Sequence, residues 1–292
     1  MKANLYKSRK SSRKKNNLGF LTIFVLVILG ALMVLPNKSK APDNKETVSS
    51  TKTPAIVDKT ETLSDSLVWP EDQIVEAKVL MYHHVGPLPD NADDTRRGLT
   101  VSAENFESQL KYLKDNNYII STLKELYEMI SRGEDVSRVI VLTFDDGYSD
   151  NFDYAWDTMQ KYDVKGTFFI ISGKIGQNEY MSEQQIKNLS SFGNEIGSHT
   201  VNHPSMKNLS PDQARSELSD SKNALEELSG QSIISFCYPA GKYTDETKLI
   251  ADEVGYKIAV TTQKGKPFST NEPFEIPRYR INPTTNLESS FK

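Results

Sequence analysis

The 292-residue chain has few cysteines and few histidines, and these low counts limit the chemistry open to it. A single cysteine, Cys237, excludes an intramolecular disulfide framework and any zinc site built from several cysteines. Only four histidines are available to bind a metal or transfer protons. Acidic residues outnumber Lys and Arg by 39 to 35, and this net charge of −4 argues against a nucleic-acid-binding protein.

The average charge hides a strong asymmetry at the amino terminus. Residues 1–17 carry seven Lys and Arg side chains and no acid, so the remainder has 28 basic against 39 acidic residues, a net of −11. Residues 18–35 are apolar and uncharged, and a helix of that length spans roughly 27 Å, close to the hydrocarbon thickness of a bilayer. This pattern predicts a transmembrane anchor with a basic cytoplasmic tail, and places the rest of the chain outside the cell.

A cleaved signal peptide is the alternative for this segment. Cleavage would need small residues near the end of the apolar run, which instead ends in Met-Val-Leu-Pro at residues 33–36. Residues 39–41, Ser-Lys-Ala, match a cleavage site only weakly, and no cysteine follows for a lipoprotein anchor. Residues 36–72 are rich in Lys, Asp, Thr, Ser and Pro, and this composition predicts a disordered linker.

Residues 73–292 alternate between apolar, strand-like runs and amphipathic helical stretches. Such alternation predicts parallel strands with crossover helices, and therefore an α/β domain with a barrel-like fold. The predicted strands cover residues 75–82, 138–144, 166–172, 195–198, 233–238, 257–262 and 276–281. The predicted helices cover residues 103–116, 123–132, 154–162, 182–192 and 211–229.

Polar residues are concentrated where these predicted strands end. Because the carboxyl ends of barrel strands share one face, where active sites lie, we expect these residues to converge. They are His83-His84, Asp145-Asp146, His199, His203 and the Pro239-Ala240-Gly241 segment.

Two of these groups suit a metal ion. The adjacent carboxylates of Asp145 and Asp146 repel each other, which favours a cation beside them, although Asp-Asp-Gly is also ordinary turn chemistry. His199 and His203 are four residues apart, which places both rings on one side of a helical turn, although such a pair often arises by chance. Two imidazoles and one carboxylate leave positions for water and substrate, as in catalytic metal sites.

Residues 143–147 (TFDDG) and 199–203 (HTVNH) together resemble the first two motifs of the polysaccharide deacetylase family (NodB-like, carbohydrate esterase family 4). The resemblance covers residues 76 to 292. It implies a distorted (β/α) barrel and metal-dependent removal of acetyl groups from N-acetylated sugars. The metal expected for the nitrogen and oxygen ligands is zinc, with cobalt, nickel or iron as alternatives.

Carried over residue by residue, the resemblance gives individual side chains a role. Asp145 is the general base, and the metal ligands are Asp146, His199 and His203. Residues 238–241 (YPAG) are similar to the third motif of the family, which makes the Ala240 backbone N–H a candidate oxyanion donor. Without the other motifs, an ordinary turn explains this segment equally well.

The chain departs from the family pattern at the residue that orients the base. The family usually has an Arg just before the proline of the third motif, whereas no basic residue occurs from Gln231 to Gly241. Arg278 or Arg280 could replace it from another strand, but surface charge is the preferred interpretation of both.

The second departure concerns the general acid. The family usually places a His near the end of the domain, whereas no His follows His203 here. Residues 80–85 (LMYHHV) on the first strand instead resemble the permuted branch of the family, similar to poly-N-acetylglucosamine deacetylases. His83 then protonates the leaving amine, and His84, on the other side of the strand, is a supporting or surface residue.

The remaining candidates carry weaker signals. Cys237 lacks a basic neighbour that would lower its pKa, so a nucleophilic role is disfavoured. Four side chains could stack on a sugar, although core or surface packing is the default interpretation of each. They are Tyr148, Asn151, Trp156 and Tyr180.

Two classes of function follow from the sequence. The leading hypothesis is hydrolytic N-deacetylation of an N-acetylglucosamine-containing cell-surface polysaccharide. A poly-N-acetylglucosamine-like exopolysaccharide is the favoured substrate, and peptidoglycan is the alternative. The rival hypothesis is a catalytically silent carbohydrate-binding wall protein, which only the missing Arg supports. Both predict a polysaccharide and a membrane as partners, and no nucleic acid.

Overall fold

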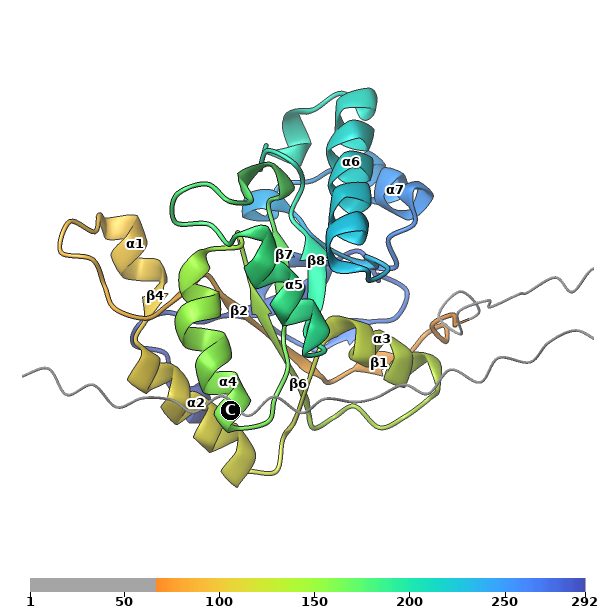
Figure 1. Ribbon diagram of the computed structural model, residues 1–292. Helices are drawn as coiled ribbons and strands as arrows, with labels where there is room; N and C mark the ends of the chain where they lie inside the picture. Colours follow the sequence, from red (N-terminus) through yellow and green to blue (C-terminus); the bar gives the residue numbers. More distant parts are fainter. Residues whose placement is uncertain (1–66, 292) are drawn as a thin grey trace, which may run out of the picture. The chain divides into compact units, whose positions relative to one another are not determined.

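The computed structural model describes residues 67–291, and its largest sheet has eight strands in which every neighbouring pair is parallel (Figure 1). Seven of the strands close into a barrel in the order β2-β12-β10-β9-β8-β7-β6, because β6 also pairs with β2. The strands are β2 (Lys78–Tyr82), β6 (Val139–Phe144), β7 (Thr167–Ile170), β8 (Glu195–Ser198), β9 (Ser235–Cys237), β10 (Ile258–Lys264) and β12 (Ile276–Arg280). The eighth strand, β5 (Ile119–Ser121), pairs with the first half of β6.

Helices connect the strands and pack on the outside of the sheet (Figure 1). They are α2 (Ala103–Asp115), α3 (Leu123–Ser131), α4 (Asp157–Lys161), α5 (Glu183–Ser191), α6 (Pro211–Ser229) and α7 (Asp245–Val254), with the short α1 (Asp94–Leu99) and α8 (Leu287–Ser290). Ser182 and Ser210 begin α5 and α6 with capping boxes, and Gly230 ends α6 in the left-handed conformation. The predicted α/β barrel is therefore confirmed.

The elements differ from the prediction in a few places. The predicted strand at 75–82 divides into β1 (Ile74–Val75) and β2, and β1 pairs antiparallel with β11 (Phe268–Ser269). The helix predicted at 154–162 begins earlier, as a π-helical turn over Asn151–Trp156 that continues into α4. Two further short strands, β3 (His84–Val85) and β4 (Thr100–Val101), pair beside the barrel.

Two apolar clusters fill the interior of the barrel and the space between the sheet and the helices. Their members alternate along β6, with Val139 and Val141 inside the barrel and Ile140 and Leu142 against the helices. This alternation continues beyond the apolar residues, so it decides which polar side chains at the ends of the strands point into the barrel.

The segment before the barrel closes its amino-terminal end. Trp69 stacks on Tyr127 with ring centroids 5.6 Å apart, lies 6.2 Å from the ring of Phe268, and donates a hydrogen bond to the Tyr127 carbonyl. It belongs to the interior cluster with the first residues of several strands, such as Val139 and Ile276. The folded structure thus includes residues 67–72, which their composition placed in the linker.

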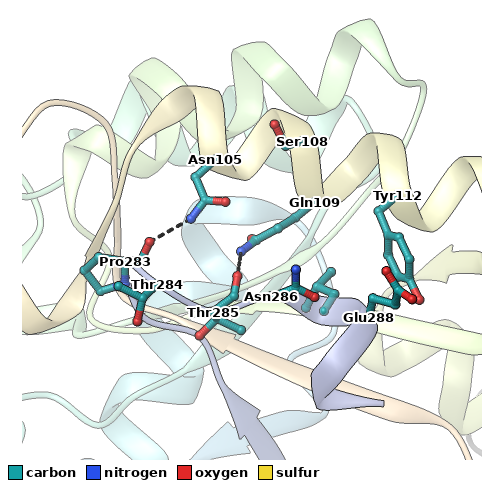
Figure 2. A pocket seen from close by; sticks show the side chains of 10 residues that line it. Asn105, Ser108, Gln109, Tyr112, Pro283, Thr284, Thr285, Asn286 and Glu288 are labelled. Atoms are coloured by element: carbon teal, nitrogen blue, oxygen red, sulfur yellow. Dashed lines mark hydrogen bonds between the residues drawn. The ribbon is translucent and has the colours of Figure 1, made fainter. Parts of the chain in front are cut away.

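The carboxyl-terminal segment is held against α2. Asn105 and Gln109 donate side-chain hydrogen bonds to the carbonyls of Pro283 and Thr285, at 2.9 and 3.1 Å (Figure 2). These contacts border a polar cavity of about 390 Å³ between α2 and residues 283–288.

No helix within residues 67–291 is long and apolar enough to cross a bilayer. The predicted tail and anchor, residues 1–17 and 18–35, lie outside the described part of the chain. The same holds for residues 36–66 of the predicted linker.

A buried carboxylate near the amino end of the barrel yields a stability prediction. Glu195 accepts hydrogen bonds from the Lys124 N–H and from the hydroxyls of Thr167 and Ser235, at 2.7 to 2.8 Å. Replacing Glu195 by Ala leaves three buried donors without an acceptor, and we expect the free energy of unfolding to fall by about 3 kcal/mol or more. Urea denaturation measures this loss.

The pH dependence of unfolding provides the control. Burial raises the pKa of Glu195, so the folded state holds its proton more tightly than the unfolded state. Its contribution to stability is therefore largest below the ordinary carboxyl pKa and declines as the pH rises through the raised value. Glu195→Gln should remove this decline, and an unchanged pH profile would contradict the assignment.

Candidate functional site

The alternation along the strands points a set of polar side chains into the mouth of the barrel. On β6 and just after it, Thr143 and Asp145 follow Val141 on the interior side. On β12, Arg278 follows Ile276 in the same way. Polar side chains thus line the interior of the barrel at its mouth.

Asp146, His199 and His203 converge in the arrangement expected of a metal site. The Asp146 Oδ1 atom lies 3.3 Å from His199 Nε2 and 3.4 Å from His203 Nε2. One ligand atom from each of the three residues lies within 4.8 Å of the other two. The three residues that the resemblance assigns to the metal therefore form a group that can hold a divalent cation.

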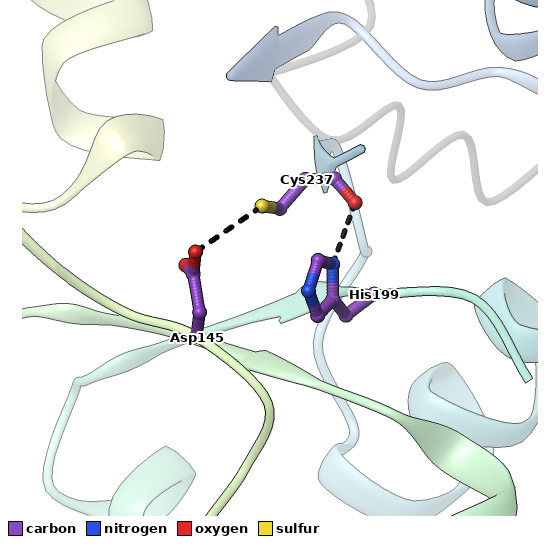
Figure 3. Close-up of side chains that lie close together, drawn as sticks. All are labelled: Asp145, His199 and Cys237. Atoms are coloured by element: carbon purple, nitrogen blue, oxygen red, sulfur yellow. Dashed lines mark hydrogen bonds between the residues drawn. The ribbon is translucent and has the colours of Figure 1, made fainter. Parts of the chain in front are cut away.

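The orientation of His199 is set by a backbone carbonyl. Its Nδ1 lies 2.7 Å from the Cys237 carbonyl oxygen, which can only accept a hydrogen bond, so Nδ1 carries the proton (Figure 3). In the neutral ring the Nε2 atom then keeps its lone pair, and this atom faces Asp146. A hydrogen bond from the second ring nitrogen to a carbonyl is the usual support of a metal-binding histidine.

A second group of possible ligand atoms, Asp145, His199 and Cys237, does not suit a metal (Figure 3). The nitrogen of His199 that faces Cys237 is already protonated, and both oxygens of Asp145 are bonded to Arg278. Burial also raises the pKa of the Cys237 thiol, which disfavours the thiolate needed for metal binding or nucleophilic attack.

The segment that carries the two histidines is a loop, so the expectation of a helical turn is wrong. Thr200 and His203 both have positive φ, 67° and 57°, which a helix does not allow. The His203 N–H donates to Thr200 Oγ1 at 2.9 Å, and this contact closes the turn. The rings of His199 and His203 come together because Thr200 and His203 adopt the left-handed backbone conformation.

Glu217 on α6 fastens this loop from outside. Its carboxylate accepts the backbone N–H groups of Val201 and Asn202, both at 2.9 Å, and the Asn202 side-chain amide at 2.7 Å. Sequence reasoning missed Glu217, because an acid on a polar helix gives no signal of what it contacts.

Strained backbone is concentrated at the site. Within the described residues eight non-glycine residues have positive φ, and four of them belong to the three motifs. These four are Asp146, Thr200, His203 and Ala240. Such conformations cost of order 1–3 kcal/mol each and persist where the surrounding structure imposes them, typically at functional sites.

Arg278 holds Asp145, which corrects the interpretation of Arg278 as surface charge. Arg278 is 1 % exposed, and its guanidinium contacts the two Asp145 carboxylate oxygens at 2.7 Å each. Burial favours the neutral form of Asp145, but the charge and hydrogen bonds of Arg278 outweigh it and keep the pKa of Asp145 below its ordinary value. Arg280 is exposed, as expected.

His83 lies opposite this pair. Its Nε2 atom is 3.9 Å from Asp145 Oδ2, while Nδ1 is buried without a hydrogen-bond partner among the described residues. Burial lowers the pKa of His83, and the nearby carboxylates of Asp145 and Asp146 oppose this effect. The side chain of Asn151 donates to the His83 carbonyl at 2.8 Å and fixes the backbone there.

His84 points away from Asp145 but is not on the surface. It is 3 % exposed, its Nδ1 lies 2.9 Å from Asp150 Oδ2, and its ring stacks on Tyr148 with centroids 3.8 Å apart. Of the two roles open from the sequence, the structure therefore supports the one of a supporting residue.

The Pro239–Gly241 turn lies at the carboxyl end of β9. Ala240 is exposed and has φ 51°. A Cβ atom on Gly241 would lie 2.0 Å from Thr262 Oγ1, so only glycine fits against β10 at this point. Gly241 thus packs tightly against Thr262 on β10, while Ala240 stays exposed.

The buried ion pair leads to a stability prediction. Replacing Arg278 by Met leaves the Asp145 charge buried and unpaired, and we expect the free energy of unfolding to fall by about 3–5 kcal/mol. The double variant Arg278→Met with Asp145→Asn should recover most of the loss, since no charge remains. Urea denaturation tests both, with Arg280→Met as the exposed control. Equal losses for Arg278→Met and Arg280→Met would rule out the pairing.

The loop support leads to a prediction for metal affinity. Glu217→Gln weakens the clamp on residues 199–203, so we expect Zn²⁺ affinity to fall about 10- to 100-fold, as for other residues that support metal ligands. Competition with a chromophoric chelator measures the affinity. Glu227→Gln, an exposed acid on the same helix, is the control. Unchanged affinity in the Glu217 variant would show that the clamp does not position the ligands.

The chain is similar to known proteins of one family. The family model described as polysaccharide deacetylase matches residues 132–259. The Bacillus subtilis protein YxkH, named for the same family, is 31 % identical over 270 residues, which cover 90 % of this chain and 93 % of that protein. The poly-beta-1,6-N-acetyl-D-glucosamine N-deacetylase of Staphylococcus aureus is 26 % identical over 200 residues, which cover 64 % of this chain and 69 % of that protein.

The solved structure of the Streptococcus pyogenes deacetylase PplD, in complex with acetate, has the same fold. Its TM-score is 0.69 at 32 % sequence identity, and the match covers 75 % of this chain and 100 % of that chain.

Proposed function

Because the chain belongs to the polysaccharide deacetylase family, we propose that it hydrolyses N-acetyl groups of a cell-surface polysaccharide that contains N-acetylglucosamine. A poly-N-acetylglucosamine-like exopolysaccharide is the favoured substrate. The observation that carries the proposal is the convergence of a paired carboxylate, three metal-ligand candidates and a histidine at one mouth of the barrel.

The residues present fit a divalent cation, and zinc is our first choice. Asp146, His199 and His203 would hold it, because their ligand atoms already converge and the Nδ1 hydrogen bond of His199 directs its Nε2 atom toward Asp146. Cobalt, nickel and iron accept the same nitrogen and oxygen ligands. When bound, the ion supplies polarisation of the acetyl carbonyl and a lowered pKa for water.

Asp145 is the general base of the proposed reaction. It takes a proton from the attacking water, which requires an ionised carboxylate. Arg278 keeps Asp145 ionised and holds both of its oxygens, so the orientation of the base is fixed. Arg278 on β12 thus takes the role of the Arg that is missing before Pro239.

His83 is the general acid and Ala240 the oxyanion donor. A proton held on His83 Nε2, 3.9 Å from Asp145, can pass to the nitrogen of the leaving sugar amine. The backbone N–H of Ala240, an exposed residue after β9, donates to the oxygen that becomes negatively charged in the tetrahedral intermediate.

The relatives guide the choice of substrate. The Staphylococcus aureus relative acts, by its name, on poly-beta-1,6-N-acetyl-D-glucosamine. His83 directly follows β2, the first barrel strand, and this position also favours this branch over the peptidoglycan deacetylases, which remain the alternative. An anchor at residues 18–35, as the sequence predicts, would place the domain outside the cell membrane, where such polymers lie.

A catalytically silent carbohydrate-binding protein is the second candidate. The only observation in its favour was that the third motif lacks an Arg to orient the base. Arg278 orients Asp145 instead. The complete set of base, acid and ligand residues argues against this candidate.

Acetate release tests the proposal. The full-length chain, supplied with Zn²⁺ or Co²⁺, should release acetate from β-1,6-linked N-acetylglucosamine oligomers faster than from chitin oligomers or peptidoglycan. Asp145→Asn should keep the metal and lower turnover by about 10²- to 10⁴-fold, because it removes the base. His203→Ala should lose the metal, measured by elemental analysis. The exposed Asp157→Asn is the control.

Two outcomes would count against the proposal. No acetate release from any of these polymers with any divalent metal would favour the silent binding protein. Full metal content in Asp146→Ala, His199→Ala and His203→Ala would exclude the proposed ligands.

A further inference from the structure

The imidazole of His83 lacks a hydrogen bond at its second ring nitrogen. Nε2 lies 3.9 Å from Asp145 Oδ2, while Nδ1 is buried and has no partner among residues 67–291. A histidine that transfers protons is usually oriented by a bond from the nitrogen that does not react. His199 has such a bond, to the Cys237 carbonyl. The direction of the His83 ring therefore depends on how firmly its backbone is held.

The backbone of His83 lies in a break between two strands. β2 ends at Tyr82, and β3 begins at His84. Backbone pairing holds the residues on either side, because the Asp145 N–H donates to the Tyr82 carbonyl at 2.9 Å and His84 pairs with Thr100. His83 itself belongs to neither strand, so another group has to fix it.

Asn151 supplies this contact. Its side-chain amide nitrogen donates to the His83 carbonyl oxygen at 2.8 Å. A carbonyl can only accept a hydrogen bond, so the orientation of the Asn151 amide is unambiguous. Asn151 is 0 % exposed, which excludes stacking on a sugar, one of the roles left open by the sequence. What its side chain holds is the backbone of the proposed acid.

The residue before Asn151 holds the other half of the same dipeptide. Asp150 Oδ2 lies 2.9 Å from His84 Nδ1 and accepts a hydrogen bond from the Arg96 guanidinium at 2.8 Å. Asp150 and Asn151 thus contact His84 and His83 respectively. We call these two residues the Asp150–Asn151 clamp.

The clamp stands where the π-helical turn of Asn151–Trp156 begins. Turns of this kind are rare and occur mostly at functional sites. Just before the clamp, the Ser149 N–H donates to the Glu179 carbonyl at 2.9 Å, which fixes the segment to a second part of the chain. Residues 145–151 therefore carry the proposed base and also support the proposed acid.

Proton transfer depends strongly on this kind of support. A general acid acts within about 2.6–3.2 Å of the atom that it protonates. A displacement of about 1 Å caused by a residue outside the reaction can lower a rate about 100-fold. Loss of the Asn151 contact frees the His83 carbonyl, and the ring moves with the backbone that carries it.

We propose that Asn151 is a positioning residue of the reaction: by holding the His83 carbonyl, it keeps the His83 ring directed at the nitrogen of the leaving amine. The proposal rests on the proposed function, in which His83 protonates that nitrogen. Asp150 supports the same arrangement through His84.

The leaving group of the substrate tests the proposal, because only a poor leaving group needs the acid. An amine has to gain a proton to depart, whereas 4-nitrophenolate leaves 4-nitrophenyl acetate as a stable anion. With the full-length, zinc-loaded chain, Asn151→Leu should lower kcat for acetate release from the β-1,6-linked N-acetylglucosamine trimer by about 10- to 100-fold. KM should stay unchanged, since Asn151 is buried, and so should the rate of ester hydrolysis.

Asn116 provides a matched control. Its side-chain amide also donates to a backbone carbonyl at 2.8 Å, that of Tyr112, but it is exposed at the end of α2. Asn116→Leu should change neither rate. Unchanged ester hydrolysis and zinc content show that an Asn151 variant is folded. Asn151→Ala, which leaves space instead of filling it, should give the same result as Asn151→Leu.

A double-variant cycle separates an effect on His83 from general damage to the site. Asn151→Leu is combined with His83→Ala, and the trimer is the substrate. If Asn151 acts through the His83 ring, its replacement lowers turnover in the unmodified chain but causes no further loss once that ring is gone. A residue with a purely structural role would lower turnover by the same factor in both backgrounds.

The outcomes distinguish this proposal from the proposed function. A loss confined to the amide substrate and absent from the His83→Ala background supports Asn151 as a positioning residue. Acetate release that Asn151→Leu and Asn151→Ala leave unchanged, or lower as much as ester hydrolysis, would overturn that role and keep the deacetylase. An unmodified chain that releases no acetate from the trimer but hydrolyses the ester would overturn the deacetylase, and the positioning of an acid with it.

Discussion

The ion pair between Arg278 and Asp145 is the interaction on which the site depends. A carboxylate buried alone in the mouth of the barrel would take up a proton and could not act as a base. Arg278 prevents this with two parallel hydrogen bonds, and it also donates to Thr143 and to the Thr261 carbonyl. One guanidinium thereby connects β12 to β6 and β10, and it holds the Asp145 carboxylate in place.

Much of this site could be predicted because parallel strands follow simple geometry. The carboxyl ends of the strands share one face, so polar residues after the strands had to converge, and Asp146, His199 and His203 do so. His83 and His84 follow β2 directly, and their rings lie on opposite sides of the chain with different partners, as expected. Both predictions need only the position of a residue at the end of a strand and the alternation of side chains, and neither requires knowledge of distant contacts.

The rest depended on contacts between residues far apart in the chain. Arg278 and Asp145 are separated by 133 residues, and which side chain of β12 faces Asp145 depends on the register of a closed barrel. The loop of His199 and His203 has the predicted spacing in an unpredicted conformation, since Thr200 and Glu217 stabilise left-handed backbone there. Hydrogen bonds of this kind leave no periodic pattern in a sequence.

The position of Trp69 has a consequence for how the protein can be attached to a surface. The chain joins the folded domain at the amino-terminal end of the barrel, beneath the first residues of the strands. The mouth with Asp145 is at the opposite end, where the strands finish. A surface or fusion partner joined directly before residue 67 therefore lies at the end of the barrel opposite the mouth, and it leaves the mouth open to a long polymer.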